Sequence, residues 1–140
     1  MIDELDQQIL RLLEENSRRP VKEIAPKVCL SAPAVKERIL KLEEKSIITG
    51  YTLQIDYLKA GKAVQAFVLF ETTNCQAFRE FAQKQPEVLE CHRVAGKYSY
   101  LVKVAVENME KLETFIDKAL KYGSSSTHII FSTQKNPFFN

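Results

Sequence analysis

Tryptophan is absent from the 140-residue sequence, and cysteine, glycine and histidine are scarce, with three, four and two copies. Cys29, Cys75 and Cys91 lie far apart, without a C-x-x-C pair or a histidine at zinc-ligand spacing. This spacing predicts free thiols in a reducing compartment and no metal site. The sequence also has no Gly-rich phosphate loop and no nucleophile elbow, so we expect no cofactor and no hydrolase chemistry.

Long hydrophobic runs are missing as well. No apolar stretch approaches the roughly 20 residues that span a membrane. The first residues, Met1 to Glu4, are acidic and lack the basic and apolar regions of a secretory signal. A composition with 45% hydrophobic and 27% charged residues is typical of a soluble globular protein. We therefore expect a cytoplasmic protein with no membrane partner.

An overall excess of one charge is lacking, because 20 basic residues stand against 18 acidic ones and the net charge is +2. The distribution is uneven, however. Between Arg18 and Lys41 the sequence has seven basic and two acidic residues. A local excess of positive charge is typical of a surface that binds a polyanion such as DNA.

Apolar residues recur at helical spacing in the first part of the chain. They predict an amphipathic helix over residues 4–15, with Asp3 as its N-cap. A shorter second helix begins at Pro20, whose fixed φ suits the first helical position, and stops near Cys29.

A third helix follows the second after only two residues. Ser31 is its expected N-cap, and one apolar stripe continues to an end near Lys45 or Ser46. The short connection has the length of a helix-turn-helix corner. Residues 1–48 are therefore predicted to form a winged-helix-like, helix-turn-helix DNA-binding domain, although an ordinary three-helix bundle with a solvated basic face also fits the spacing.

The periodicity then changes from helical to alternating. Tyr51, Leu53 and Ile55 alternate with polar residues, which predicts a linking strand within residues 49–60. Residues 61–140 predict a strand at 62–72, a helix at 75–85, strands at 87–95 and 98–106, a helix at 108–122 and a strand at 124–133. This βαββαβ order is the ferredoxin-like plan, so the fold class is α+β.

In such a domain both helices cover one face of the sheet. A hairpin turn is expected at Gly96-Lys97, between the two central strands. The other face carries alternate residues drawn, depending on register, from Ala66, Val68, Phe70, Leu101, Lys103, Ile129 and Phe131. This face is too apolar to remain in water, so we expect two copies to dimerise face to face.

Fragments along nearly the whole chain resemble the Lrp/AsnC family, the feast/famine regulators of bacteria and archaea. They are Leu5-Asp6, Ile9-Leu10, Ile24-Ala25, Leu30-Ser31-x-x-x-Val35-x-x-Arg38-Ile39-x-x-Leu42-Glu43, Ile47-Ile48 and Val94-Ala95-Gly96-x-Tyr98-x-Tyr100-Leu101. The resemblance implies a transcription factor that reads double-stranded DNA as a homodimer, often within a tetramer or octamer. It also implies that the C-terminal domain senses amino acids or related metabolites.

The resemblance assigns DNA contacts to the third helix and its surroundings. Ser31 caps the recognition helix, and Pro33, Ala34 and Lys36 approach base edges. Lys41 and Arg38 reach phosphates, although Arg38 could instead pair with an acidic side chain, and Lys22 is a further DNA-binding residue. For each lysine a solvated surface charge is the alternative. Two such helices in a dimer imply a palindromic operator.

Two positions depart from the family pattern. Cys29 stands where many members have glycine, at a corner that often demands positive φ. Ser99 stands where many members have an aspartate suited to a ligand's ammonium group. The effector is therefore open: an amino acid, another metabolite or none. Any pocket is expected at a subunit interface, built from Gly96, Tyr98, Ser99 and Tyr100 and closed by Thr127 and His128.

Two other functions are weighed against the regulator. An enzyme resembling the sirohaem decarboxylases would need convergent histidines and arginines, yet the sequence offers only His92, beside Arg93, and His128. We therefore expect no enzyme activity. An architectural protein that bends DNA with little sequence preference is the other alternative. The end of the chain, Pro137 to Asn140, fits either an arm on a neighbouring subunit or a disordered end.

Overall fold

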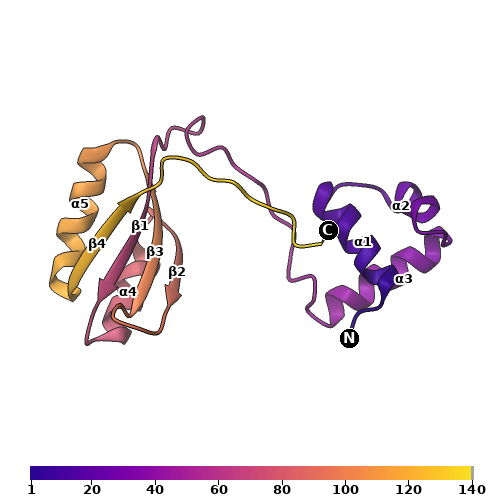
Figure 1. Cartoon of the computed structure of the whole chain (residues 1–140), viewed down its shortest axis with the longest axis horizontal. Helices are drawn as coiled ribbons and strands as arrows, with labels where there is room; N and C mark the ends of the chain where they lie inside the picture. The colour runs from indigo at the N-terminus through magenta and orange to yellow at the C-terminus, as the bar shows by residue number, and fades with distance from the viewer. Residues whose placement is uncertain (140) are drawn as a thin grey trace. The chain divides into compact units, whose positions relative to one another are not determined.

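The computed structural model describes residues 1–139 and divides the chain into two compact units (Figure 1). The first unit contains Met1–Gln54 together with the end of the chain from Gln134, and the second contains Ile55–Thr133. Within the described residues, no helix is long and apolar enough to cross a membrane.

Three helices form the first unit: α1 (Glu4–Glu15), α2 (Val21–Lys27) and α3 (Ala32–Glu44). Asp3 and Asp6 cap the start of α1 reciprocally, each carboxylate accepting the other residue's backbone N–H. The Ser31 hydroxyl accepts the N–H of Ala34 and caps α3, as predicted. Pro20 occupies the N-cap of α2, one position before the first helical position expected for it. The other ends of these three helices lie within two residues of the positions predicted from the sequence.

Each helix contributes a fully buried side chain to the core of this unit. Ile9 from α1, Ile24 from α2 and Val35 from α3 have no exposed surface, and Leu13 and Val28 pack around them. Burying one such aliphatic side chain stabilises a fold by about 1.5–3 kcal/mol. The apolar stripes seen in the sequence therefore fix how the three helices pack.

The corner between α2 and α3 takes the backbone conformation expected of it. Cys29 has a φ of +55°, in the left-handed region. The N–H of Leu30 donates to the carbonyl of Ala25 at 3.1 Å, which closes the turn. The sequence does form the corner, with a cysteine at the position where glycine is the residue with least strain.

The linking strand predicted within residues 49–60 is not formed in the single chain. No strand is assigned between α3 and the first strand of the second unit. Tyr51, Leu53 and Ile55, the apolar side of the alternation, are 53%, 80% and 51% exposed. Alternation describes which way side chains point, but a strand also needs a neighbour to accept its hydrogen bonds.

The end of the chain lies against α1 of the same unit. The N–H of Phe138 donates to the Glu14 carboxylate at 2.6 Å, and the rings of Phe138 and Phe139 pack edge to face with their centroids 4.9 Å apart. This arrangement was not among the two alternatives expected from the sequence. Asn140 lies outside the described residues.

The second unit has the predicted βαββαβ order: β1 (Val64–Glu71), α4 (Cys75–Lys84), β2 (Val88–Arg93), β3 (Tyr100–Val106), α5 (Met109–Ala119) and β4 (Ser124–Ile129). A short 3₁₀ turn, η1 (Leu120–Tyr122), follows α5. The strands form one antiparallel sheet in the order β2-β3-β1-β4. The observed strands are shorter than predicted at their ends, where single hydrogen bonds, such as that from the Val94 N–H to the Ser99 carbonyl, continue beyond the regular pairing.

The register decides which face of the sheet is covered. Ala66, Val68 and Phe70 are fully buried in one core with side chains from α4 and α5, so both helices lie on the same face, as predicted. The sequence had offered these three residues, and Ile129, for the open face. Ile129 pairs with Ala66 and therefore shares its side of the sheet.

The opposite face is left open by the helices. It presents Phe67 and Leu69 of β1, which pair with Lys103 and Leu101 of β3; Ala105 lies on the same side but is buried. Leu101 and Lys103 thus lie where the sequence expected them, whereas Phe131 lies beyond the end of β4 and is 98% exposed.

Candidate nucleic-acid interface and effector site

One side of α3 faces solvent. Val35 and Leu42 are buried beneath the helix, while Pro33, Lys36 and Lys41 are exposed and Ala34 is half-buried. No acidic residue occupies the first turn of α3, so the positive end of its dipole is not neutralised there. The capped end of α3 and Lys36 together present positive charge to a neighbouring phosphate or base edge.

The three lysines expected to contact DNA differ in whether they form a salt bridge. Lys41 lies 3.7 Å from Glu37 in an exposed pair one turn apart, which contributes little and leaves the ammonium free to move. Lys36 and Lys22 have no salt-bridge partner among residues 1–139. All three are exposed, as a DNA contact requires.

Arg38 has acidic partners of its own. Its Nη1 donates to both Asp3 oxygens, at 2.9 and 2.7 Å, and to Asp6 Oδ1 at 3.0 Å. The hydrogen bond from Arg38 holds the pKa of Asp3 below its usual value, and the two carboxylates raise the pKa of Arg38. These contacts join α3 to the start of α1, the alternative named for Arg38 from the sequence. In this geometry Arg38 holds α3 against the start of α1, while Lys36 and Lys41 stay exposed.

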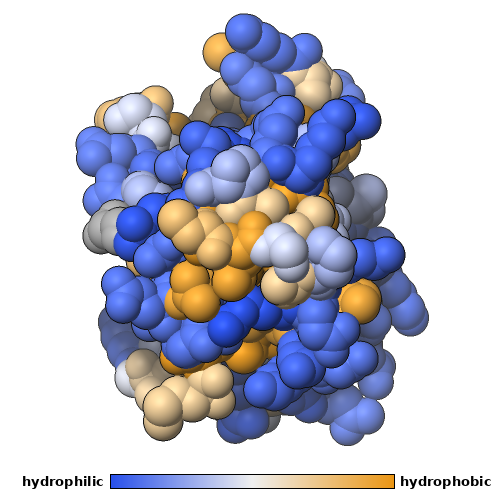
Figure 2. Space-filling view, turned by 90° about the vertical axis from the view of Figure 1, so that its right-hand side faces the viewer, coloured by the Kyte–Doolittle hydropathy of each residue, from blue (hydrophilic) through white to orange (hydrophobic). Residues whose placement is uncertain are grey.

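Apolar residues also reach the surface of the first unit. Figure 2, which looks onto the side carrying the three helices, shows hydrophobic residues gathered within a mostly hydrophilic surround. On α3 itself, Leu40 is 42% exposed. An exposed apolar side chain on a recognition helix can contact the methyl group of thymine.

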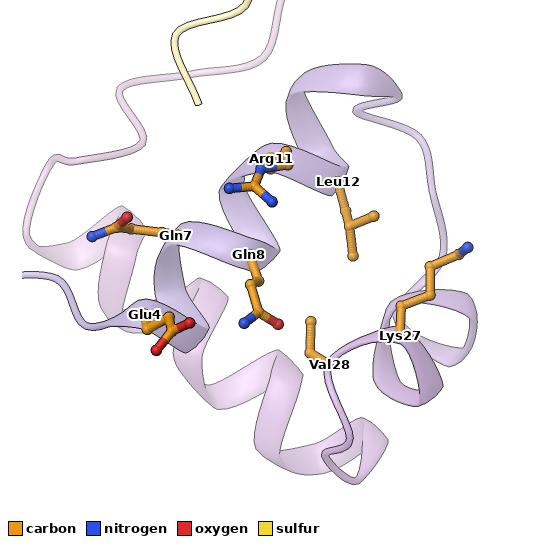
Figure 3. Close-up of a pocket in the computed structure, with 7 residues that line it drawn as sticks. All are labelled: Glu4, Gln7, Gln8, Arg11, Leu12, Lys27 and Val28. Carbon is orange, nitrogen blue, oxygen red and sulfur yellow. The ribbon is translucent and has the colours of Figure 1, made fainter. Parts of the chain in front are cut away.

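A groove of about 300 Å³ lies on α1 and the end of α2 (Figure 3). Its lining is formed by Glu4, Gln7, Gln8, Arg11, Leu12, Lys27 and Val28. In Figure 3 the side chains of Leu12 and Val28 point toward each other across the groove, whereas the Lys27 ammonium points away from it. Charged groups do not converge in the groove, and α3 contributes none of its lining.

The expected effector residues are only partly brought together. Gly96, with φ of +126°, and Tyr98 lie in the turn between β2 and β3. Ser99 follows them, where its N–H donates to the carbonyl of Phe70 at 2.7 Å and its hydroxyl donates to that of Thr72 at 3.1 Å. The Ser99 hydroxyl is therefore used by the protein backbone, and this position supplies no negative charge for an ammonium group.

The other three expected residues lie away from the surface of this turn. Tyr100 is buried beneath α4, where its ring stacks on Phe78 with centroids 4.8 Å apart. Thr127 and His128 are on β4, at the sheet edge opposite β2. Thr127 lies on the helix-covered face, while His128 is on the open face, 3.0 Å from the Ser126 hydroxyl. One chain alone does not assemble the six residues into a single pocket.

The histidines and acids do not form a reactive cluster. His92 Nε2 lies 3.1 Å from Glu90, and Arg93 points to the other side of the sheet. Within residues 1–139, no three His, Cys, Asp or Glu side chains are placed to hold a metal ion. Sequence reasoning did not single out Arg79, which lines a groove near Tyr100 because α4 packs on β2, an arrangement that no sequence spacing reveals.

Each of the two units matches a known protein family. Residues 2–43 match the model of the AsnC-type helix-turn-helix domain, and residues 65–137 match that of the Lrp/AsnC ligand binding domain. The chain is 42% identical over 132 residues to the uncharacterized HTH-type transcriptional regulator YezC of Bacillus subtilis, covering 94% of this chain and 95% of that protein. It is 36% identical to the HTH-type transcriptional regulator LrpC of the same organism, covering 94% and 92%.

Solved structures agree with these sequence matches. The structure of B. subtilis LrpC superposes with a TM-score of 0.92 at 34% identity, covering 98% of this chain and 99% of that one. The leucine response regulatory protein LrpA of Mycobacterium tuberculosis superposes with a TM-score of 0.80 at 26% identity, covering 96% of both chains.

Proposed function

Because the chain belongs to the Lrp/AsnC family of DNA-binding transcriptional regulators, which join a helix-turn-helix to a ligand-binding domain, we propose that it binds palindromic operators as a dimer or larger oligomer. The family comprises regulators rather than enzymes, so the decarboxylase alternative is set aside. The single observation that carries the proposal is the exposed side of α3, which carries Lys36 and Lys41 and has no acidic residue in its first turn. A regulator of this kind would act in the cytoplasm, where the chromosome lies.

In the proposed complex α3 lies in the major groove. Pro33, Ala34 and Lys36, from the first turns of the helix, approach base edges, as the N-terminal part of a recognition helix does. Lys41 and Lys22 contact phosphates on either side, and Ser31 fixes the first turn through its cap. Arg38 holds α3 against α1 and contributes to DNA binding through that contact.

Dimerisation is proposed to occur through the open face of the sheet. Phe67, Leu69 and Leu101 lie together on that face as neighbours across β1 and β3, and all three are only half-buried in the single chain. A contiguous apolar surface of this kind is typical of a protein–protein interface. The resulting dimer supplies two recognition helices, and further assembly to a tetramer or octamer would present more.

We also propose that an amino acid or another small metabolite modulates DNA binding through the second unit. The match of residues 65–137 to a ligand-binding domain supports this role. An effector at Gly96, Tyr98 and Ser99 would find backbone groups and hydroxyls rather than a carboxylate. Thr127 and His128 would complete such a pocket only from another subunit.

A gel-shift titration tests the proposal. The purified protein is titrated against its own promoter region and an equal-length random duplex, at two salt concentrations. We expect the promoter to bind at least about 1,000-fold more tightly than the random duplex, as specific complexes do. Replacing Lys36 and Lys41 by alanine should abolish most of this preference, whereas Lys118→Ala, an exposed lysine on α5, should not. Equal affinity for both duplexes would favour the architectural alternative instead.

A further inference from the structure

A second groove lies between α4 and β2 in the ligand-binding unit. It measures about 450 Å³, a size suited to a small molecule. Ala82, Val88 and Leu89 give it an apolar wall, and Arg79, Arg93 and Tyr100 give it a polar end. The hairpin residues Gly96 to Ser99 do not contribute to its lining.

The Tyr100 hydroxyl at the polar end lacks a hydrogen-bond partner. Only 1% of the Tyr100 surface is exposed, and within residues 1–139 its oxygen has no donor or acceptor at hydrogen-bond distance and angle. Burial raises the pKa of this phenol and the polar contact with the Cys75 thiol, which falls short of a well-formed hydrogen bond, raises it further, while the charges of Arg79 and Arg93 lower it. A buried hydroxyl without a partner costs stability, so a ligand group that pairs with it gains binding energy.

Two guanidinium groups flank this hydroxyl. Arg93 is the cross-strand partner of Tyr100 and therefore points to the same side of the sheet. Arg79 follows Phe78, whose ring stacks on Tyr100, and its charge also lowers the pKa of Cys91 on β2. Neither arginine forms a salt bridge within residues 1–139.

The one acid in the lining is already engaged. Glu90 lies 3.1 Å from His92, so its carboxylate is shared with another residue. The groove therefore offers two positive charges and one hydroxyl donor at its polar end, whereas Glu90 and His92 lie on the opposite side of β2 from Arg93 and Tyr100. Arginine and tyrosine in this arrangement recognise a carboxylate, because a guanidinium donates two parallel hydrogen bonds to its oxygens.

We propose that this groove binds a small carboxylate with an apolar substituent and no ammonium group, such as a branched 2-oxo acid. The carboxylate lies between Arg79 and Arg93 and accepts the Tyr100 hydroxyl, while the apolar part lies along Val88 and Leu89. Because the Tyr100 oxygen has almost no exposed surface in the free protein, this binding requires the exposed side chains of Arg79 and Arg93 to move aside. This site deepens the effector role proposed for the unit and is separate from the hairpin position.

Titration calorimetry on the full chain tests this site without DNA. The probes are 4-methyl-2-oxopentanoate, L-leucine, which replaces the oxo group by an ammonium, and the neutral 4-methylpentanamide. We expect saturable binding of the oxo acid, at least about tenfold tighter than either other probe, because only the oxo acid matches the charge of the groove. Inorganic phosphate should not displace it at equal concentration.

Three variants connect binding to the named groups. Tyr100→Phe should weaken oxo-acid binding about tenfold while leaving the melting temperature of the free protein equal or higher, because it removes only an unpaired hydroxyl. Arg93→Gln should weaken it at least as much. Lys97→Gln, which removes an exposed cation in the hairpin, should leave it unchanged.

The site is refuted if the oxo acid shows no saturable binding, if leucine or the amide binds equally, or if neither Tyr100→Phe nor Arg93→Gln weakens binding. Retained promoter binding in a ligand-free gel shift shows that such a failure concerns this groove alone. Loss of promoter binding in the same preparation would instead count against the proposed regulator.

Discussion

Two residues with left-handed backbone conformations show how differently a positive φ can be accommodated. Cys29 has a φ of +55° in an exposed corner, where its Cβ is tolerated. Gly123 has a φ of +146° directly after η1, and a Cβ there would overlap the carbonyl of Glu71 at the end of β1. The resemblance to the family predicted the positive φ at Cys29. The need for glycine at position 123 could not be predicted, because the Glu71 carbonyl that a Cβ would overlap is distant in the sequence.

Gly123→Ala should destabilise the ligand-binding unit strongly. The substitution combines an unfavourable φ with an overlap against backbone, so we expect a loss of about 3 kcal/mol in the free energy of unfolding. Urea denaturation followed by circular dichroism measures it. Gly50→Ala is the matched control, since no atom lies within 4 Å of the added Cβ, and should change stability by less than about 0.5 kcal/mol. Equal effects of the two substitutions would show that the Glu71 contact is unimportant.

Cys29→Gly should stabilise the helix-turn-helix unit. Glycine removes the steric cost of a positive φ but adds freedom to the unfolded chain, so we expect a net gain of about 0.5–1 kcal/mol. The comparison is with Cys29→Ala, which removes the thiol but keeps the strained φ and should leave stability nearly unchanged. The melting temperatures of both variants test this expectation. A Cys29→Gly protein less stable than Cys29→Ala would show that the positive φ at this position causes no strain.

At the scale of the elements, local signals predicted the helices well and the sheet register poorly. The caps at Asp3 and Ser31 act within one turn, so the sequence alone locates the helix starts. In β1, by contrast, Ala66, Val68 and Phe70 alternate with Phe67 and Leu69, so both faces are apolar. Only packing against α4 and α5 selects the covered face.

The contact between α1 and α3 predicts a dependence of stability on pH. Because Arg38 lowers the pKa of Asp3 in the folded state, the pair stabilises the fold above the unfolded pKa of about 3.9. That contribution is lost as the pH falls through the lower, folded value. The melting temperature should therefore fall between about pH 5 and pH 2.5, and fall less in Asp3→Asn, which keeps a capping side chain.

A matched carboxylate serves as the control for this experiment. Asp117 on α5 has no salt bridge within residues 1–139, so Asp117→Asn should retain the full acid dependence of the original protein. If Asp3→Asn and Asp117→Asn gave the same melting curve at every pH, the ion pair would not stabilise the contact between α1 and α3.

At the scale of the whole molecule, the sequence predicted the family because its characteristic fragments lie in both units. The effector site could not be predicted in the same way. Ser99 departs from the family's aspartate, and the groove beside Tyr100 depends on how α4 packs against β2. The proposed assembly uses the open face of the sheet, whose residues became known only with the register.

Leu101→Glu should separate the dimer. A carboxylate on the open face would be buried without a partner in the dimer, which is unfavourable by several kcal/mol. Analytical ultracentrifugation should show a monomer, and operator affinity should fall by at least about 100-fold because one recognition helix then binds alone. Leu120→Glu, at a leucine that is 59% exposed on η1, should affect neither measurement. A Leu101→Glu protein that remained dimeric would place the interface elsewhere.

Hydroxyl-radical footprinting on the promoter tests the central claim most directly, that paired α3 helices read a palindromic site. The account predicts two protected half-sites whose centres lie about 10 base pairs, or a multiple of that spacing, apart on one side of the duplex. In Lys36→Ala both protections should weaken together, since each protomer contributes the same side chain. Uniform protection of every duplex tested, or a single half-site unaffected by Lys36→Ala, would contradict it.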